Sequence, residues 1–188
     1  LYVKDFSDIN ALFQYLLKSN CDLVEECLQQ HEKLNKMYPG SINTIRLVTV
    51  YKNGNAKAVV SYFRMGKSEN FVDNFISGGL LTRVDIETGK LMFDAVDHEG
   101  KIYAEHPDTK INIKGFTIPM WDDCIEMALN AAAVIPQVGY VGWDIAVTPD
   151  GPALVEGNEF PGHVMYQLPA HTPDNYGLLP LFNKIIFG

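Results

Sequence analysis

The chain has 188 residues, of which 47% are hydrophobic, and a formal net charge of -8. This length and composition suit one globular core, or two small lobes that share an interface. The 23 acidic against 15 basic residues exclude broad attraction to nucleic acid or to an anionic membrane, so any phosphate binding must be local. No stretch approaches the roughly 18 apolar residues of a membrane span, and we expect no membrane insertion.

Three cysteines, Cys21, Cys27 and Cys124, form an odd set without metal-type spacing. This usage indicates reduced thiols and a cytoplasmic protein, and we expect no secretory leader. Because it begins at Leu1 without an initiator Met, we expect it to be a fragment of a longer protein.

The first predicted element is a short helix. Ser7 or Asp8 can cap it, apolar residues then recur at helical spacing, and Asn20 ends it. Residues 22–28 are apolar enough to predict a strand. The polar residues 29–37 predict a loop or one or two helical turns, ended by Pro39-Gly40.

Two strands are predicted at residues 45–51 and 56–63, because Asn53-Gly54 between apolar runs is a strong hairpin signal. Shorter strands at 81–86, 91–97 and 101–105 extend the meander. A helix over 121–135 and a hairpin with arms 140–147 and 153–158 follow, and a last helix spans 173–186. The fold class is therefore α+β, a mainly antiparallel sheet covered by helices.

The last hairpin carries an oxygen-rich group. Its turn, Pro149-Asp150-Gly151, brings Asp144 on one arm beside Glu156 and Asn158 on the other, and the latter two share a face because they are two residues apart. Two carboxylates and an amide oxygen suit Mg²⁺. The alternative is a set of ordinary polar groups at strand ends, although the apolar neighbours make unpaired acids there costly.

Arginines occur only at positions 46, 64 and 83. Arg46 and Arg64 stand in otherwise apolar strands, where a guanidinium can hold phosphate or carboxylate oxygens with two hydrogen bonds. The alternative is that each arginine pairs with a structural acid such as Asp73.

Two further stretches are weaker signals. Residues 70–79 include Asn74 and end in Gly78-Gly79, which lets a backbone approach a ligand or simply forms a turn. Residues 23–28 include Glu25 and Glu26, and the edge of such a strand could hold a nucleoside or be an ordinary exposed strand end.

In this order, the motifs resemble the C-terminal portion of an ATP-grasp ligase. Their wording is closest to the sugar-transfer-associated ATP-grasp family found with surface-polysaccharide genes. The resemblance covers nearly the whole chain and rests on Val24-Glu25-Glu26-Cys27-Leu28, Asn43-Thr44-Ile45-Arg46, Arg64, Val72-Asp73-Asn74-Phe75, Gly78-Gly79, Gly142-Trp143-Asp144, Glu156-Gly157-Asn158 and Pro161-Gly162.

The resemblance implies a role for each matched residue. Residues that would bind ATP are Glu25, Glu26, Cys27 and Leu28 at the adenine, Glu32 at the ribose and Arg46 at the triphosphate. Arg64 and Asn74 would steady an acyl-phosphate as catalytic residues. The residues that would hold Mg²⁺ are Asp144, Glu156 and Asn158.

The resemblance also implies a domain organisation. Residues 1–188 would form a single, partial ATP-grasp-like domain, with 1–28 as a remnant of the middle lobe and interlobe strand and 29–188 as the C-terminal lobe. ATP-grasp enzymes carry a glycine-rich-loop lobe before this region, and we expect this chain to lack the complete lobe. We therefore expect weak or absent turnover from these 188 residues alone, even if the parent is active.

The implied function is an ATP- and Mg²⁺-dependent carboxylate-amine ligase, or a related ligase, that acts through an acyl-phosphate in surface polysaccharide biosynthesis. Its partners would be small carboxylate and amine substrates and other polysaccharide-biosynthesis enzymes. One alternative is a non-catalytic nucleotide-binding module that regulates a polysaccharide enzyme. Another is a purely structural α+β domain.

Overall fold

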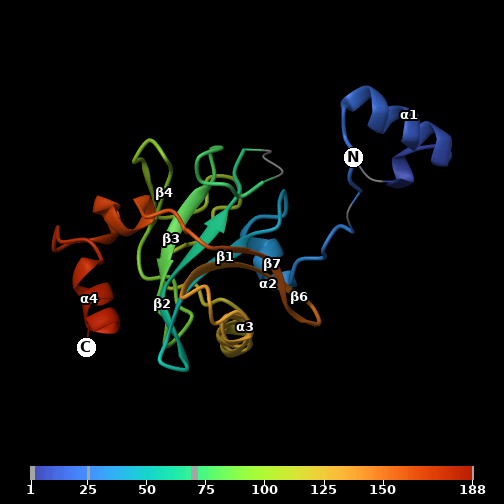
Figure 1. Cartoon of the computed structure of the whole chain (residues 1–188). Helices are drawn as coiled ribbons and strands as arrows, with labels where there is room; N and C mark the ends of the chain where they lie inside the picture. The colour runs from blue at the N-terminus through green and yellow to red at the C-terminus, as the bar shows by residue number, and fades with distance from the viewer. Residues whose placement is uncertain (1–2, 25, 69–71, 188) are drawn as a thin grey trace.

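A computed structural model describes residues 3–24, 26–68 and 72–187 (Figure 1). The helices are α1 Ile9–Ser19, α2 Glu32–Met37, α3 Trp121–Val134 and α4 Leu179–Phe187, with 3-10 turns at Val3–Asp5, Val164–Gln167 and Pro169–His171. The strands are β1 Thr44–Lys52, β2 Asn55–Met65, β3 Leu80–Val84, β4 Ala95–Val96, β5 Ile102–Tyr103, β6 Tyr140–Thr148 and β7 Gly151–Asn158. The predicted α+β class is confirmed.

Within the described residues the strands form one seven-stranded sheet in the order β5-β4-β3-β2-β1-β6-β7, and every named pair is antiparallel. The β1–β2 hairpin turns at Asn53 and Gly54, whose φ angles of 53° and 80° both lie in the left-handed region. That conformation suits the right-handed twist of the flanking strands, which explains the Asn-Gly signal.

The two faces of the sheet bury different segments of the chain. On one face, Ile45, Leu47 and Phe63 pack in a core that includes Cys124 and Ala128 of α3. On the other, Val48, Val60, Tyr62 and Leu81 pack beneath Tyr166 and Leu178, and Phe182 of α4 packs against them. Alternation along the strands therefore separates an α3 face from a face covered by the C-terminal segment, called here the C-terminal face.

The predicted first helix is confirmed as α1. The carboxylate of Asp8 accepts hydrogen bonds from the backbone N–H groups of Asn10 and Ala11, at 2.8 and 2.9 Å. Asn20 ends the helix in the left-handed conformation. Figure 1 shows α1 standing apart from the sheet. We call residues 20–24 and 26–30, which follow α1 and contain no helix or strand, the linker.

The prediction of a strand at residues 22–28 is wrong. Leu23, Val24 and Leu28 are exposed, and the described residues of the segment pair with no strand of the described chain. An apolar run becomes a strand only when another strand supplies its hydrogen-bond partners. Glu25 lies outside the described residues.

Smaller differences occur at other element ends. The predicted strands 81–86, 91–97 and 101–105 are shorter in the structure, as β3, β4 and β5. The last helix begins at Leu179 and not near residue 173, because Asn175 and Gly177 take left-handed φ angles of 60° and 63°. A helix does not continue through such residues.

Candidate functional site

The residues predicted for the metal and for the phosphates meet in one row across three strands. Glu156 of β7 lies opposite Asp144 of β6, and Asp144 lies opposite Arg46 of β1. Arg46 in turn lies opposite Tyr62 of β2. Directly opposed residues in an antiparallel pair project from the same face, so these side chains share the C-terminal face. We call Glu156, Asp144 and Arg46 the charged row.

Arg46 and Asp144 form a buried ion pair in the middle of this row. The two residues are 9% and 3% exposed. Arg46 Nε donates to Asp144 Oδ1, and Arg46 Nη2 donates to Oδ2 at 2.9 Å. This bidentate geometry is the strongest arrangement of guanidinium and carboxylate.

The ion pair fixes the protonation state of Asp144. Burial acts to raise the pKa of its carboxyl group, but the hydrogen bond from Arg46 and the charges of Arg64 and Arg46 outweigh burial and hold the pKa below its usual value. Asp144 therefore stays ionised throughout the neutral pH range.

Arg64 joins the same carboxylate from β2. Its Nη2 donates to Asp144 Oδ2 at 2.9 Å, while Nε and Nη2 donate to Thr44 Oγ1 at 2.9 and 2.6 Å. Asp73 lies on the far side, with Oδ2 3.7 Å from Arg64 Nε, and accepts hydrogen bonds from the backbone N–H and hydroxyl of Thr44. Both arginines therefore have carboxylate partners, as the structural alternative predicted.

The outer end of the row is open to solvent. Glu156 is exposed, and its Oε1 accepts a hydrogen bond from Asn158 Nδ2 at 3.0 Å. The β6–β7 register shifts between Asp144 and Ile145, which leaves one extra residue on β7 next to Glu156. Such bulges bend a strand and re-aim its side chains, and they occur often beside active sites.

Gly142 makes room for Arg46. It lies on β6 two residues before Asp144, and a Cβ atom there would stand 2.6 Å from Pro161 Cβ and 3.1 Å from Arg46 Cδ. A glycine within a strand often marks such a close approach. Pro161 and the side chain of Arg46 thus occupy the space that a side chain at Gly142 would need.

The donor set of the charged row fits a hard cation. Within the described residues, no group of three His, Cys, Asp or Glu side chains could hold a metal ion. A metal here would therefore have only two protein carboxylates, those of Asp144 and Glu156, and the amide oxygen of Asn158. The arginines use three of about four acceptor positions on Asp144, which leaves one on Oδ1. Mg²⁺ takes one or two protein carboxylates and fills its shell with phosphate and water, which matches this set.

Asn74 lies beside this cluster and does not contact it. Its Oδ1 accepts from the backbone N–H of Ile76 at 3.0 Å, and its carbonyl accepts from Ser77 and Gly79. A Cβ at Gly79 would lie 2.4 Å from the carbonyl oxygen of Asp73, so only glycine fits there. Residues 70 and 71 of the same predicted motif lie outside the described residues.

The residues predicted for adenine and ribose lie away from the sheet. Glu26, Cys27 and Leu28 are exposed on the linker, and they line a groove of about 1140 Å³ between α1 and residues 39–42. Glu32 is exposed at the first position of α2. The linker meets the sheet where His31 N donates to Val147 O at 2.8 Å, three residues beyond Asp144 along β6.

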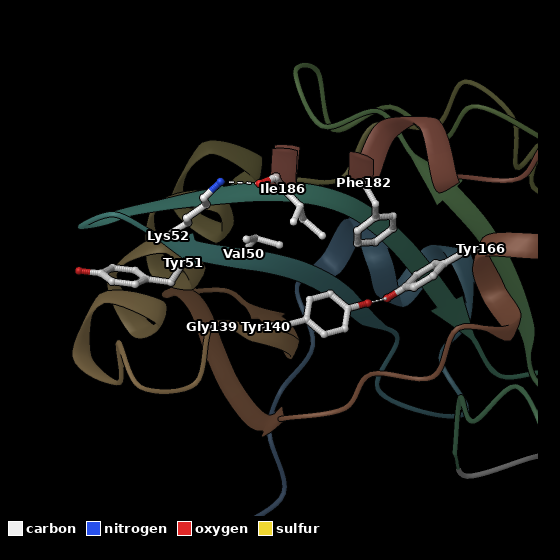
Figure 2. Close-up of a pocket in the computed structure, with 8 residues that line it drawn as sticks. All are labelled: Val50, Tyr51, Lys52, Gly139, Tyr140, Tyr166, Phe182 and Ile186. Carbon is white, nitrogen blue, oxygen red and sulfur yellow. Dashed lines mark hydrogen bonds between the residues drawn. The ribbon is translucent and has the colours of Figure 1, made fainter. Parts of the chain in front are cut away.

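An apolar cavity of about 480 Å³ lies further along the C-terminal face, between the ends of β1 and β6 and α4. Figure 2 shows Val50 facing Phe182 and Ile186, and the hydroxyls of Tyr140 and Tyr166 facing each other. These hydroxyl oxygens are 2.7 Å apart. Tyr166 also stacks on Tyr62, the neighbour of Arg46 in the sheet, so one tyrosine separates this wall of the cavity from the charged row.

Sequence reasoning assigned no role to Thr44, Gly142 or Tyr62. Thr44 and Arg46 are two residues apart on one strand, which already predicts a shared face. Gly142 in an apolar strand was a signal for close approach of another group. The position of Tyr62 depends on the β1–β2 register, and no local pattern reveals its place beside Arg46.

Comparison with known proteins adds an independent line of argument. A family model described as sugar-transfer associated ATP-grasp matches residues 4–185, nearly the whole chain. A search of curated proteins finds no match. Within the described residues, no helix combines the length and the apolar character needed to cross a membrane. The family is one of ATP-binding domains and supports ATP-dependent, ligase-type chemistry associated with sugar transfer. With its charged row and its seven-stranded antiparallel sheet, this chain belongs to the sugar-transfer-associated ATP-grasp family.

Proposed function

We propose that the chain contributes the phosphate- and metal-binding face of an ATP- and Mg²⁺-dependent ligase that activates a carboxylate for attack by an amine. The observation that carries this proposal is the charged row together with Arg64. Arg46 and Arg64 converge with Asp144 and Glu156 on one sheet face, where Asp144 is buried between the two cations and Glu156 is open to solvent. A face that is structural only would gain more from apolar side chains of similar volume.

Each residue of the face has a proposed task. Arg46 and Arg64 turn part of their hydrogen bonding from Asp144 to phosphate oxygens, for which the guanidinium fork is suited. Asp144, Glu156 and Asn158 hold the metal from the protein side. Bound Mg²⁺ neutralises charge on the phosphates during transfer.

In the proposed reaction, a carboxylate oxygen of the substrate attacks the γ-phosphorus of ATP, the bond to the bridging β,γ-oxygen breaks and ADP leaves. An amine then attacks the acyl carbon, the bond to the phosphate oxygen breaks, and the amine gives up a proton. Arg64 is the residue best situated to steady the acyl-phosphate, because it reaches Asp144 and the Asp73 loop at once. Asn74 would have to leave its bond to Ile76 N to join it.

The nucleoside end is proposed to lie along the linker. Among described residues, Glu26, Cys27 and Leu28 form no hydrogen bond with another backbone group, and only the Leu28 carbonyl is used, as the acceptor of the Cys27 thiol. Their backbone N–H groups are therefore available to hold an adenine ring. Glu25 and Glu32 complete the proposed nucleotide contacts. The change from exposed linker to packed sheet also supports a division in which residues 29–188 form the C-terminal lobe.

Calorimetric titration of ATP, with and without Mg²⁺, tests this proposal on the wild-type chain and on the Asp144→Asn, Glu156→Gln double variant. We expect magnesium to tighten ATP binding in the wild type and not in the variant. Equal magnesium-dependent affinity in both proteins would refute the metal assignment.

A non-catalytic nucleotide-binding module remains the second candidate, and a specific observation favours it. The side chain of Asn74 forms its hydrogen bond inside its own loop. Among the described residues of that loop, only Asp73 therefore brings a polar side chain to Arg64. Trapping with hydroxylamine separates the two candidates. A ligase forms an acyl-phosphate from at least one carboxylate, and hydroxylamine converts that acyl-phosphate to a hydroxamate. A binding module gives no hydroxamate while it still binds Mg-ATP. In either case we propose a cytoplasmic protein that works with polysaccharide-biosynthesis enzymes.

A further inference from the structure

The third arginine shares the face of the charged row. Arg83 of β3 lies opposite Tyr62 of β2, and Tyr62 lies opposite Arg46. All three arginines of the chain, at 46, 64 and 83, therefore project from the C-terminal face. Arg83 is only partly exposed.

Arg83 differs from the other two because it has no carboxylate partner in the described part of the chain. Arg46 and Arg64 both reach Asp144. The acid closest in sequence, Asp85, accepts hydrogen bonds from the backbone of Glu87 and from both the backbone and hydroxyl of Thr88. The charge of Arg83 reaches Asp85 weakly, as the last of the influences that lower the Asp85 pKa. A half-buried guanidinium without an acid has unused hydrogen-bond donors.

The neighbour of Arg83 is a buried tyrosine whose hydroxyl is also unused. Tyr62 is 1% exposed, and among described residues its hydroxyl forms no hydrogen bond. Tyr166 stacks over the Tyr62 ring with centroids 6.2 Å apart, but the Tyr166 hydroxyl is paired with that of Tyr140 (Figure 2). The Tyr62 hydroxyl oxygen is not among the fully enclosed unpaired polar atoms of the described residues, so it remains open to a ligand group.

A third unused group comes from the segment that covers the sheet. His171 is 1% exposed; its Nε2 bonds the carbonyl oxygen of Asp94 at 3.1 Å, and its Nδ1 has no partner among described residues. Burial lowers the pKa of His171, and the charge of Arg83 adds to this effect, so the ring is neutral at pH 7. Nε2 then donates to the carbonyl, which makes Nδ1 an acceptor that needs a donor.

We propose that Arg83, Tyr62 and His171 form a subsite for a ligand group that carries both a negative charge and hydroxyls, either a hydroxylated carboxylate or a phosphorylated polyol. Arg83 and Tyr62 supply donors to the anion. His171 Nδ1 accepts from a ligand hydroxyl once the segment Pro169–His171 shifts to admit it. The assignment of this group to the acid substrate rests on the proposed function, whereas its binding does not.

Calorimetric titrations on the full 188-residue chain test the subsite, with and without Mg-ATP. The probes are D-glucuronate and D-glucose 6-phosphate as the two anion sources, with neutral D-glucose and acetate as controls for hydroxyls and charge alone. We expect one of the two anions to bind, and to bind more tightly than either control. Arg83→Gln should weaken it about tenfold to hundredfold, the effect of a lost charge-assisted hydrogen bond.

Matched variants separate the subsite from general charge effects. Lys57→Gln removes an exposed cation from β2 and should leave anion binding unchanged. Arg83→Lys keeps the charge and loses the fork, so it should fall between the wild type and Arg83→Gln, and Tyr62→Phe should also weaken binding. The proposal is overturned if neither anion binds at millimolar concentration in either condition, or if Arg83→Gln and Lys57→Gln behave alike.

The same titrations keep this inference apart from the proposed function. Arg83→Gln should bind Mg-ATP as the wild type does, because Arg83 is not among the residues proposed for nucleotide. Anion binding that depends on Arg83, in a chain that binds no Mg-ATP, would support the subsite and contradict the ligase. Mg-ATP binding without any anion binding would contradict the subsite and agree with the proposed nucleotide site.

Discussion

The charged row and the N-terminal linker, which we propose bind one nucleotide, present their polar groups in opposite ways. Arg46 and Asp144 are buried and held by strand pairing on both sides. Glu26, Cys27 and Leu28 are exposed on a linker without strand partners in the described chain. Arg46 and Asp144 are therefore held in place by the fold itself, whereas the described linker residues have no strand to hold them. If this comparison holds, mutations of the buried residues Arg46 and Asp144 change folding stability, and mutations in the linker do not.

Removing the central acid should have the largest effect. Asp144→Ala leaves Arg46 buried without its carboxylate, and breaking a buried pair in this way costs about 3–5 kcal/mol of unfolding free energy. Urea unfolding followed by tryptophan fluorescence measures it. Glu156→Gln, at the exposed end of the same row, is the control and should stay within about 0.5 kcal/mol of the wild type. A loss below about 1 kcal/mol for Asp144→Ala would mean that the row is not prearranged.

Filling the space beside Arg46 should have the next largest effect. Gly142→Ala places a methyl group 2.6 Å from Pro161 Cβ and 3.1 Å from Arg46 Cδ, and such overpacking costs about 1–3 kcal/mol. Gly162→Ala is a matched control in the adjoining loop, because nothing lies within 4 Å of its added Cβ. Equal urea midpoints for the two variants would contradict the close approach of Arg46 and Gly142.

Acid should weaken the row and spare the linker. The pKa of Asp144 is lowered in the folded chain, so its stabilisation is complete above the unfolded pKa of about 3.9 and is lost as pH falls through the folded value. The urea midpoint should therefore decline below about pH 4. The midpoint of Asp144→Asn should decline less over the same range. Parallel curves for the two proteins would show that Asp144 does not carry this dependence.

Thiol labelling gives the smallest and most local effect. Cys21 and Cys27 are exposed on or beside the linker, whereas Cys124 is buried and burial raises its pKa to about 12. We expect a maleimide to label the first two in the folded chain and Cys124 only after unfolding. Mg-ATP should slow the labelling of Cys27 and leave Cys21 unchanged. Equal protection of both, or of neither, would place the nucleoside elsewhere.

Strand patterns predicted the sheet well because alternation and turn chemistry are local. Asn53-Gly54 and the Pro149-Asp150 turn fixed two hairpins, and the second hairpin carried Asp144 to Glu156. The meeting of Arg46 with Asp144 is a contact between residues 98 apart, which no local pattern reveals. The resemblance to ATP-grasp proteins implied only that both residues belong to one ATP site.

The wrong strand at residues 22–28 and the unassigned Arg83 have the same physical origin. A strand at the linker needed a neighbouring strand. The proposed role of Arg83 depends on its having no ion-pair partner among the described residues and on the unpaired Nδ1 of His171. Both are facts about what surrounds a residue in space. Sequence spacing describes only what the residue itself can do.

Electron paramagnetic resonance of Mn²⁺, used in place of Mg²⁺, tests the central claim most directly. The free Mn²⁺ signal is followed in the presence of ATP for the wild type, for Glu156→Gln and for the control Glu126→Gln, which changes an exposed acid on α3. We predict that the wild type and Glu126→Gln lower the free Mn²⁺ signal beyond what ATP alone removes. The Mn²⁺ affinity of Glu156→Gln should be at least about tenfold weaker than that of the wild type. Equal depletion by all three proteins would contradict a metal site on the charged row.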